Sequence, residues 1–152
     1  MGRIDLTRAN HKIFIQRVTA VTSDSKRKWG ALEPAGMLTH LTIAIDGSLG
    51  DFPVENKSTF FSRQIIRRIA FDSPLALPKG KIKVPDEFTP APQGSIEEIR
   101  ARLLQRIERF LDIAEREPNR KQVHPFFGPL PLTYWQKLHG KHMNHHFEQF
   151  GV

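Results

Sequence analysis

The chain has 152 residues, contains no cysteine and carries a formal net charge of +7 at pH 7. Without cysteine it has no disulfide, no thiol nucleophile and no thiolate ligand, so any metal must be held by imidazole, carboxylate or water, and a cytoplasmic setting is expected. The basic residues occur in runs no longer than three, which disfavours nucleic acid as a partner, and no apolar run is long enough for a membrane span.

Apolar residues at helical spacing predict a first helix over residues 5–22 and a second over about 34–48. Pro34 suits the first turn of the second helix, because its missing N–H would have no partner there. His40 lies at the edge of the inward face of this helix. Its neighbours along the helix axis are small: Gly36, Ala44 and Gly47. These small residues either leave room for an ion and a group bound to it, or permit close packing of another helix.

The middle of the chain predicts a shorter helix over residues 58–70 and then a long connection over 71–94, which contains five prolines. Such a connection in a compact domain usually crosses the helices or covers a site. Ser95 and Glu98 form a capping box that opens the clearest amphipathic helix of the chain. That helix is expected to end before Pro118 and to supply packing only, because it carries no histidine.

The last segment predicts a helix that begins with Thr133 as its N-cap and ends at Gly151. Trp135, His142 and His146 fall within roughly 40° of one line along it. Residues four apart on a helix lie about 5–6 Å from each other, so both imidazoles can hold one ion. A buried imidazole without a partner costs roughly 1–3 kcal/mol, and a metal satisfies two of them at once. Hydrogen bonds to carboxylates or water are the alternative.

Two segments of the sequence resemble the DinB-like superfamily. One is Trp29-Gly30 with Met37-Leu38-x-His40-Leu41. The other contains His124-Pro125-Phe126-Phe127-Gly128 and ends in a His-x-x-His-His-x-x-Gln-Phe-Gly pattern over residues 142–151, as in an uncharacterised subfamily of that group. The resemblance implies an all-α four-helix bundle with a long proline-rich crossover, in a single domain over residues 1–152.

The same resemblance implies that one histidine of the second helix and two of the last helix bind a divalent metal; here these are His40, His142 and His146. Three imidazoles leave coordination positions open, which fits zinc or nickel and also admits iron or manganese. His139 lies near the line of the ligands and is a candidate either to hydrogen-bond to one of them or to serve as an alternative ligand. His145 points away and is expected to be a surface or partner residue.

Each ligand should donate its other ring N–H to an acceptor. Asp46, Glu148 and backbone carbonyl groups are the candidate acceptors, and the sequence does not rank them.

Related DinB-like proteins use the metal to activate a low-molecular-weight thiol. The resemblance therefore implies a metal-dependent S-transferase that acts on a small molecule, with bacillithiol, mycothiol or glutathione as cosubstrate. A metal-dependent hydrolase is the second enzymatic alternative. The non-catalytic alternatives are a metal that only stabilises the helices, a stress-response binding module, or a helical protein whose histidines are satisfied without metal.

Members of this group are often homodimers. Four phenylalanines are candidates either for contacts between two copies or for closing the core: Phe60, Phe61, Phe126 and Phe127. We expect them to close the core.

Overall fold

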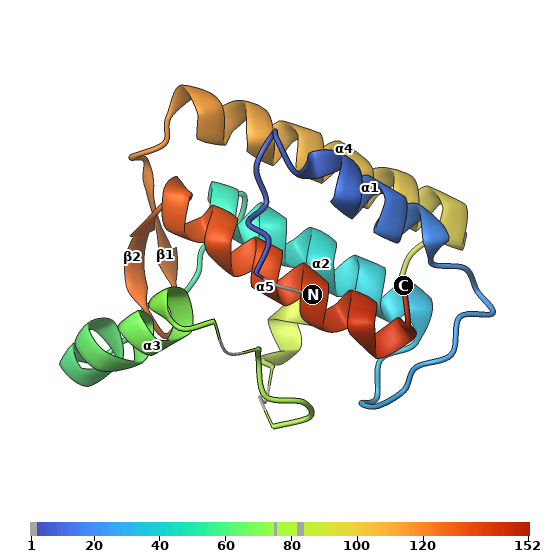
Figure 1. Cartoon of the computed structure of the whole chain (residues 1–152), viewed down its shortest axis with the longest axis horizontal. Coiled ribbons are helices and arrows are strands. Elements are labelled where there is room, and N and C mark those ends of the chain that lie inside the picture. Colours follow the sequence, from blue (N-terminus) through green and yellow to red (C-terminus); the bar gives the residue numbers. More distant parts are fainter. Residues whose placement is uncertain (1–2, 75, 82–83) are drawn as a thin grey trace.

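The computed structural model describes residues 3–74, 76–81 and 84–152. Four long helices make up most of it: α1 (His11–Ala20), α2 (Pro34–Leu49), α4 (Ile96–Arg116) and α5 (Leu132–Phe150). α2 packs against both α4 and α5, and α1 packs against the same two helices (Figure 1). Their inward faces meet in one apolar core, which includes Phe14, Leu41, Ile107, Phe110 and Phe147.

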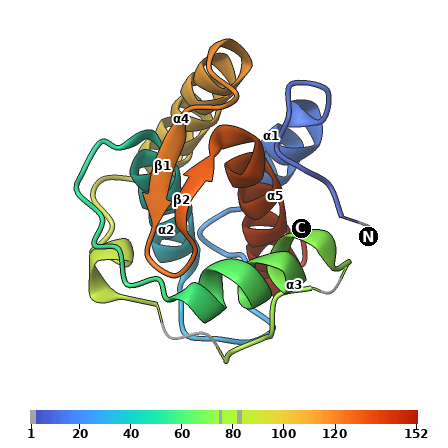
Figure 2. The ribbon, with the colours of Figure 1, turned by 90° about the vertical axis from the view of Figure 1, so that its left-hand side faces the viewer.

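Several shorter elements lie beside the long helices. They are a π-helical turn (Ser62–Ile66) that runs into α3 (Arg67–Asp72), a 3-10 turn (Asp86–Phe88) and the strands β1 (Lys121–His124) and β2 (Gly128–Pro131). The two strands pair antiparallel in a hairpin. Figure 2 shows this hairpin next to α3, at the end of the molecule where α5 begins.

The expected all-α four-helix bundle with a long proline-rich crossover is wrong. The described part of the chain contains five α-helices and a two-stranded antiparallel sheet. The strands form between α4 and α5, in a proline-rich segment for which the sequence predicted neither helix nor strand. His124 Nδ1 accepts the backbone N–H groups of Phe126 (3.1 Å) and Phe127 (3.3 Å), and Gly128 adopts a φ of 68° that favours glycine. These two features close a tight turn that apolar periodicity cannot reveal.

Several helix boundaries agree with the prediction. Pro34 is the first residue of α2, and the capping box of Ser95 and Glu98 is present at the start of α4. α4 ends at Arg116, ahead of Pro118, and Gly151 caps α5 with a φ of 73°. Thr133 is not the N-cap of α5, because that helix already begins at Leu132.

Two other boundaries differ from the prediction. The first helix begins at His11 and not at residue 5, because the preceding residues run along α5, where the Leu6 N–H donates to the Gln136 carbonyl (2.9 Å). The helix predicted over 58–70 is a π-helical turn followed by α3. Of the long connection predicted over 71–94, residues 75, 82 and 83 lie outside the described residues.

The expectation that four phenylalanines close the core is wrong for three of them. Phe60 is 75% exposed, Phe61 60% and Phe126 47%, and only Phe127 packs against the core. No helix within the described ranges has both the length and the apolar character needed to cross a membrane.

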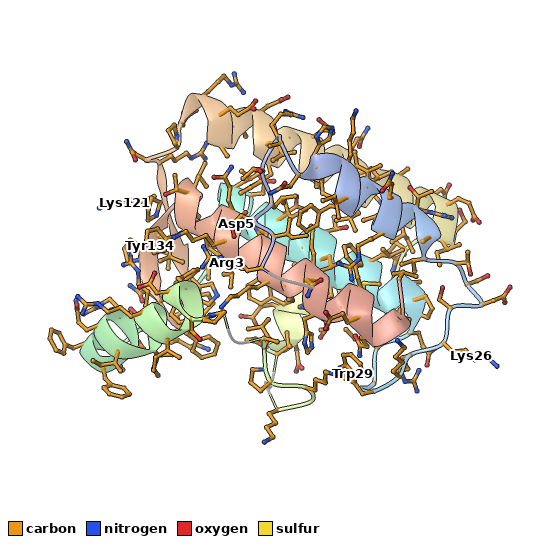
Figure 3. The ribbon with its side chains drawn as sticks, viewed as in Figure 1. Arg3, Asp5, Lys26, Trp29, Lys121 and Tyr134 are labelled. Atoms are coloured by element: carbon orange, nitrogen blue, oxygen red, sulfur yellow. The ribbon has the colours of Figure 1, made fainter. Side chains whose placement is uncertain are left out.

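The N-terminal segment lies against α5 at Gly140. Figure 3 labels Arg3 and Asp5 where this segment crosses the helix, and their side chains form an ion pair (Arg3 Nε to Asp5 Oδ1, 3.0 Å). A Cβ atom on Gly140 would lie 2.1 Å from the Ile4 carbonyl oxygen and 2.9 Å from the Asp5 Cα. Both contacts are with backbone, so only glycine permits this approach.

We therefore expect the substitution Gly140→Ala to lower the free energy of unfolding by about 1–3 kcal/mol, because the N-terminal segment must move away from α5. Gly36→Ala is the matched control, since a Cβ there meets only Leu32 Cδ2 at 3.7 Å and alanine favours a helix. Urea unfolding of both variants checks this. A Gly140→Ala protein as stable as the Gly36→Ala protein would contradict the predicted contact.

Candidate metal centre

Three histidines meet between α2 and α5. His40 comes from α2, and His142 and His146 come from consecutive turns of α5. The Nε2 atom of His142 lies 2.8 Å from that of His40 and 3.2 Å from that of His146. One ligating nitrogen from each ring lies within 4.8 Å of the other two, so the three residues form a cluster that could hold a metal ion. The structure thus brings together the three residues that the sequence predicted.

The spacing of these nitrogens suits a single ion. Two nitrogens bound to tetrahedral zinc at about 2.0–2.1 Å are separated by roughly 3.3 Å. The two separations measured from His142 are close to that value. The rings also approach at steep angles, with interplanar angles between 67° and 86°, so their edges rather than their faces converge.

A backbone carbonyl determines the protonation of His40. Its Nδ1 lies 2.7 Å from the carbonyl oxygen of Phe88, in the 3-10 turn of the long connection. A carbonyl oxygen can only accept a hydrogen bond, so Nδ1 carries the proton and the neutral ring presents a lone pair at Nε2.

Gln149 determines the protonation of His146 in the same way. Its Nε2 donates to the Trp29 carbonyl (2.7 Å), which fixes the orientation of the amide and turns Oε1 toward His146 Nδ1 at 2.8 Å. The proton of His146 is therefore on Nδ1, and a second lone pair at Nε2 faces the cluster.

The Nε2 atom of His142 lies between these two lone pairs. It carries at most one proton, which serves only one of its two neighbours, so at least one pair of nitrogens meets without a proton between them. Protonating the rings does not relieve this easily, because burial lowers the pKa of all three and brings that of His146 to about 4. A cation at the centre removes the repulsion, so the donor set fits a divalent metal.

A pocket of about 210 Å³ opens beside the cluster. His40 and His142 belong to its wall, whereas most of the remaining lining is apolar and comes from α2, the long connection and the hairpin. Examples are Ala44, Gly47, Val84, Phe88, Val123 and Phe127. His142 is only partly buried, so the cluster faces a space that a small molecule could enter. The long connection helps to cover the site, as its length and position in the sequence predicted.

His139 lies in the wall of the same pocket and makes no hydrogen bond to the cluster. The Ser48 hydroxyl donates to the Ile45 carbonyl (2.7 Å), so His139 Nε2 donates to the Ser48 oxygen (2.8 Å) and its Nδ1 has a lone pair. Burial lowers the pKa of His139 to about 3. His139 is thus a neutral ring that donates to Ser48, and it is not the hydrogen-bond partner of a ligand histidine.

The predicted acceptors for the ligand N–H groups are only partly right. A backbone carbonyl serves His40, but Asp46 pairs with Arg106 (2.6 Å) and Glu148 accepts from Asn144 (3.0 Å). Sequence reasoning missed Gln149, although its position three residues after His146 places it on the same side of the helix.

Two histidines near the site have other surroundings. His145 lies outside the cluster of three and is partly buried, with ring contacts to Trp29 and His146. His124 was not predicted as a site residue, yet it lines the pocket. Its one signal in the sequence is that it opens the His124-Pro125-Phe126-Phe127-Gly128 segment of the resemblance, since the hairpin that carries it was not predicted.

The model of a family described as "Protein of unknown function (DUF1569)" matches residues 3–151, so the chain belongs to that family. No curated protein and no solved structure gives a significant match. The function therefore has to be argued from the site itself.

Burial of the histidines predicts that the metal-free protein loses stability as the pH falls from about 6.5 to about 4.5. The pKa is lowered to about 4 for His124 and His146 and to about 3 for His139, whereas unfolded histidine titrates near 6.5. In this interval the unfolded chain binds more protons than the folded chain, so the free energy of unfolding decreases as the pH decreases.

We expect a slope of about 1 kcal/mol per pH unit or more, measured by urea unfolding in the presence of a chelator. A free energy of unfolding that stays constant from pH 6.5 to pH 4.5 would mean that the rings are not held neutral.

Proposed function

We propose that this member of the DUF1569 family is a divalent-metal-dependent enzyme. His40, His142 and His146 hold the metal, and the adjoining apolar pocket holds the substrate. The observation that carries this proposal is the convergence of three Nε2 atoms beside that pocket, two of them with lone pairs fixed by Phe88 and Gln149.

Zinc or nickel is the metal that we propose, because the ligands are three neutral imidazoles without a thiolate. When bound, the ion acts as a Lewis acid that lowers the pKa of a thiol or water molecule reaching the pocket. The chain itself holds the rings of His40 and His146 in one protonation state through Phe88 and Gln149, and a mostly apolar wall lies beside the site to orient a small molecule.

An enzyme is favoured over a purely structural metal by the open side of the cluster. A structural zinc site is normally closed by four protein ligands. Within the described residues the cluster supplies three, and His40 and His142 both line the pocket. A substrate could therefore approach the ion directly.

Transfer of a low-molecular-weight thiol to an electrophile is the reaction that we propose first. Two features support it: the resemblance of the histidine segments to DinB-like proteins, and the absence of cysteine, which means that a thiol would have to come from a cosubstrate. Hydrolysis, with water in place of the thiol, is the competing reaction.

Untagged protein is expected to contain about one equivalent of divalent metal by elemental mass spectrometry, and its melting temperature should fall when a chelator removes the ion. Alanine in place of His40, His142 or His146 should abolish the stoichiometric metal, because two imidazoles hold the ion far less tightly than three. His145→Ala is the matched control and should keep it. Full metal retention in His142→Ala, or no effect of chelator and added ions, would overturn the metal site.

The reaction can be tested on the metal-loaded protein. Loss of free thiol is followed with glutathione, bacillithiol or mycothiol and a small aromatic electrophile such as 1-chloro-2,4-dinitrobenzene. We expect the wild type to accelerate this reaction and His142→Ala to stay at the uncatalysed rate. Loaded protein that hydrolyses phenyl acetate and leaves the thiol unused would assign a hydrolase. Loaded protein without either activity would leave the metal a structural role.

A further inference from the structure

A second polar group faces the pocket apart from the metal cluster. His124, at the end of β1, belongs to the pocket wall and is partly buried. Its ring stacks on Phe127 with a centroid distance of 4.6 Å and lies 5.3 Å from the ring of Trp135. These contacts hold the imidazole in one orientation.

The hairpin turn determines which nitrogen of His124 carries the proton. Its Nδ1 receives the backbone N–H groups of Phe126 at 3.1 Å and Phe127 at 3.3 Å. Both groups can only donate, so Nδ1 is the acceptor and the proton is on Nε2. This Nε2–H has no hydrogen-bond partner among the residues that the structure describes. Burial lowers the pKa of His124 to about 4, so the ring stays neutral and keeps its single donor near pH 7.

The other polar groups of the pocket leave this donor to a ligand. His139 presents only a lone pair at Nδ1, because its Nε2–H is used by Ser48. The Lys141 ammonium group donates two of its three N–H groups to the carbonyl groups of Ala70 and Ser73. A molecule that fills the pocket therefore meets mostly apolar walls, and among the imidazoles outside the metal cluster it meets one free N–H donor at His124 and one neutral acceptor at His139.

We propose that His124 binds the carbonyl oxygen of an uncharged, mostly apolar substrate. The inference rests on the proposed function in one respect, since it takes this pocket as the substrate site. A carbonyl oxygen accepts a hydrogen bond without a charge, which suits the neutral His124 ring and the mostly apolar wall around it. A cavity of about 150 Å³ accommodates benzene, so a pocket of about 210 Å³ suits a substituted benzene or an aliphatic molecule of similar size.

A pair of probes separates the hydrogen bond from the apolar contacts. Acetophenone and ethylbenzene have nearly the same shape, and only acetophenone carries a carbonyl oxygen. We expect the wild-type protein to bind acetophenone roughly ten-fold more tightly in an NMR titration, because ethylbenzene leaves the buried N–H without a partner. The ¹⁵N shift of His124 Nε2 should move with acetophenone and stay with ethylbenzene.

Two variants assign this preference to one nitrogen. His124→Asn retains an acceptor oxygen close to Nδ1 for the turn but has no donor at Nε2, so ethylbenzene should bind as before while the preference for acetophenone is lost. His124→Gln places an N–H donor near Nε2 and should retain part of the preference. Melting temperatures report whether each variant is folded, and the Nε2 shift in the wild type provides the test if either is not.

Each titration is made on metal-loaded and on chelator-treated protein, so that failure of this inference and failure of the proposed function can be distinguished. A preference that depends on His124 and persists after chelation supports the inference even if no metal-dependent reaction is found. Three results would overturn it: equal binding of the two probes by the wild type, a preference that survives in His124→Asn or disappears on chelation, or no binding of either probe.

Discussion

The packing of α2 against α5 forces three imidazole nitrogens into one small space, and the arrangement around the site depends on this constraint. The Nε2 atom of His142 lies within 3.2 Å of the Nε2 atoms of both partners. Without a ligand, apolar side chains at these three positions would be more stable than the imidazoles. Such an arrangement costs free energy in the metal-free protein. It is understandable if a cation occupies the centre, because the same lone pairs then become ligands.

The surroundings of the cluster hold the rings in the protonation state that a metal requires. Phe88 reaches His40 from the long connection, and Gln149 links His146 to the Trp29 carbonyl in the loop before α2. Neither contact contributes a charge. Both leave the ligand set neutral, so a bound divalent ion keeps its full charge and its effect on the pKa of a thiol or water molecule is not weakened by an anionic ligand.

In the pocket beside the cluster, hydrogen-bond partners also fix the protonation of the histidines. Apolar walls from α2, the long connection and the hairpin surround histidines whose protonation is set by fixed partners: the backbone N–H groups of the turn for His124, and Ser48 for His139. A neutral imidazole with one fixed donor or acceptor recognises a ligand by direction and not by charge. The mostly apolar pocket wall contrasts with the net charge of +7 of the chain as a whole.

The sequence by itself determined the structural features that depend on residues close together in the chain. The four-residue spacing of His142 and His146 and the capping box at Ser95 are local patterns, and the structure contains both, because helix geometry relates residues three and four apart without further information. The absence of cysteine likewise limited the ligand set in advance. His40 was predicted partly through a family resemblance, since its distance in sequence from the other two leaves no local trace of their contact.

Only the tertiary structure decided the features that depend on contacts between residues far apart in the sequence. The hairpin that carries His124, and that makes the expected all-α architecture wrong, is stabilised by a turn and not by apolar periodicity. Gln149 is the partner of His146 because its amide is oriented by the Trp29 carbonyl, which lies 120 residues away in the sequence. Asp46 instead forms an ion pair with Arg106 on α4. A polar side chain can form hydrogen bonds of similar energy with several partners. The partner that it has in the structure is the one that the packing of the helices brings within hydrogen-bond distance.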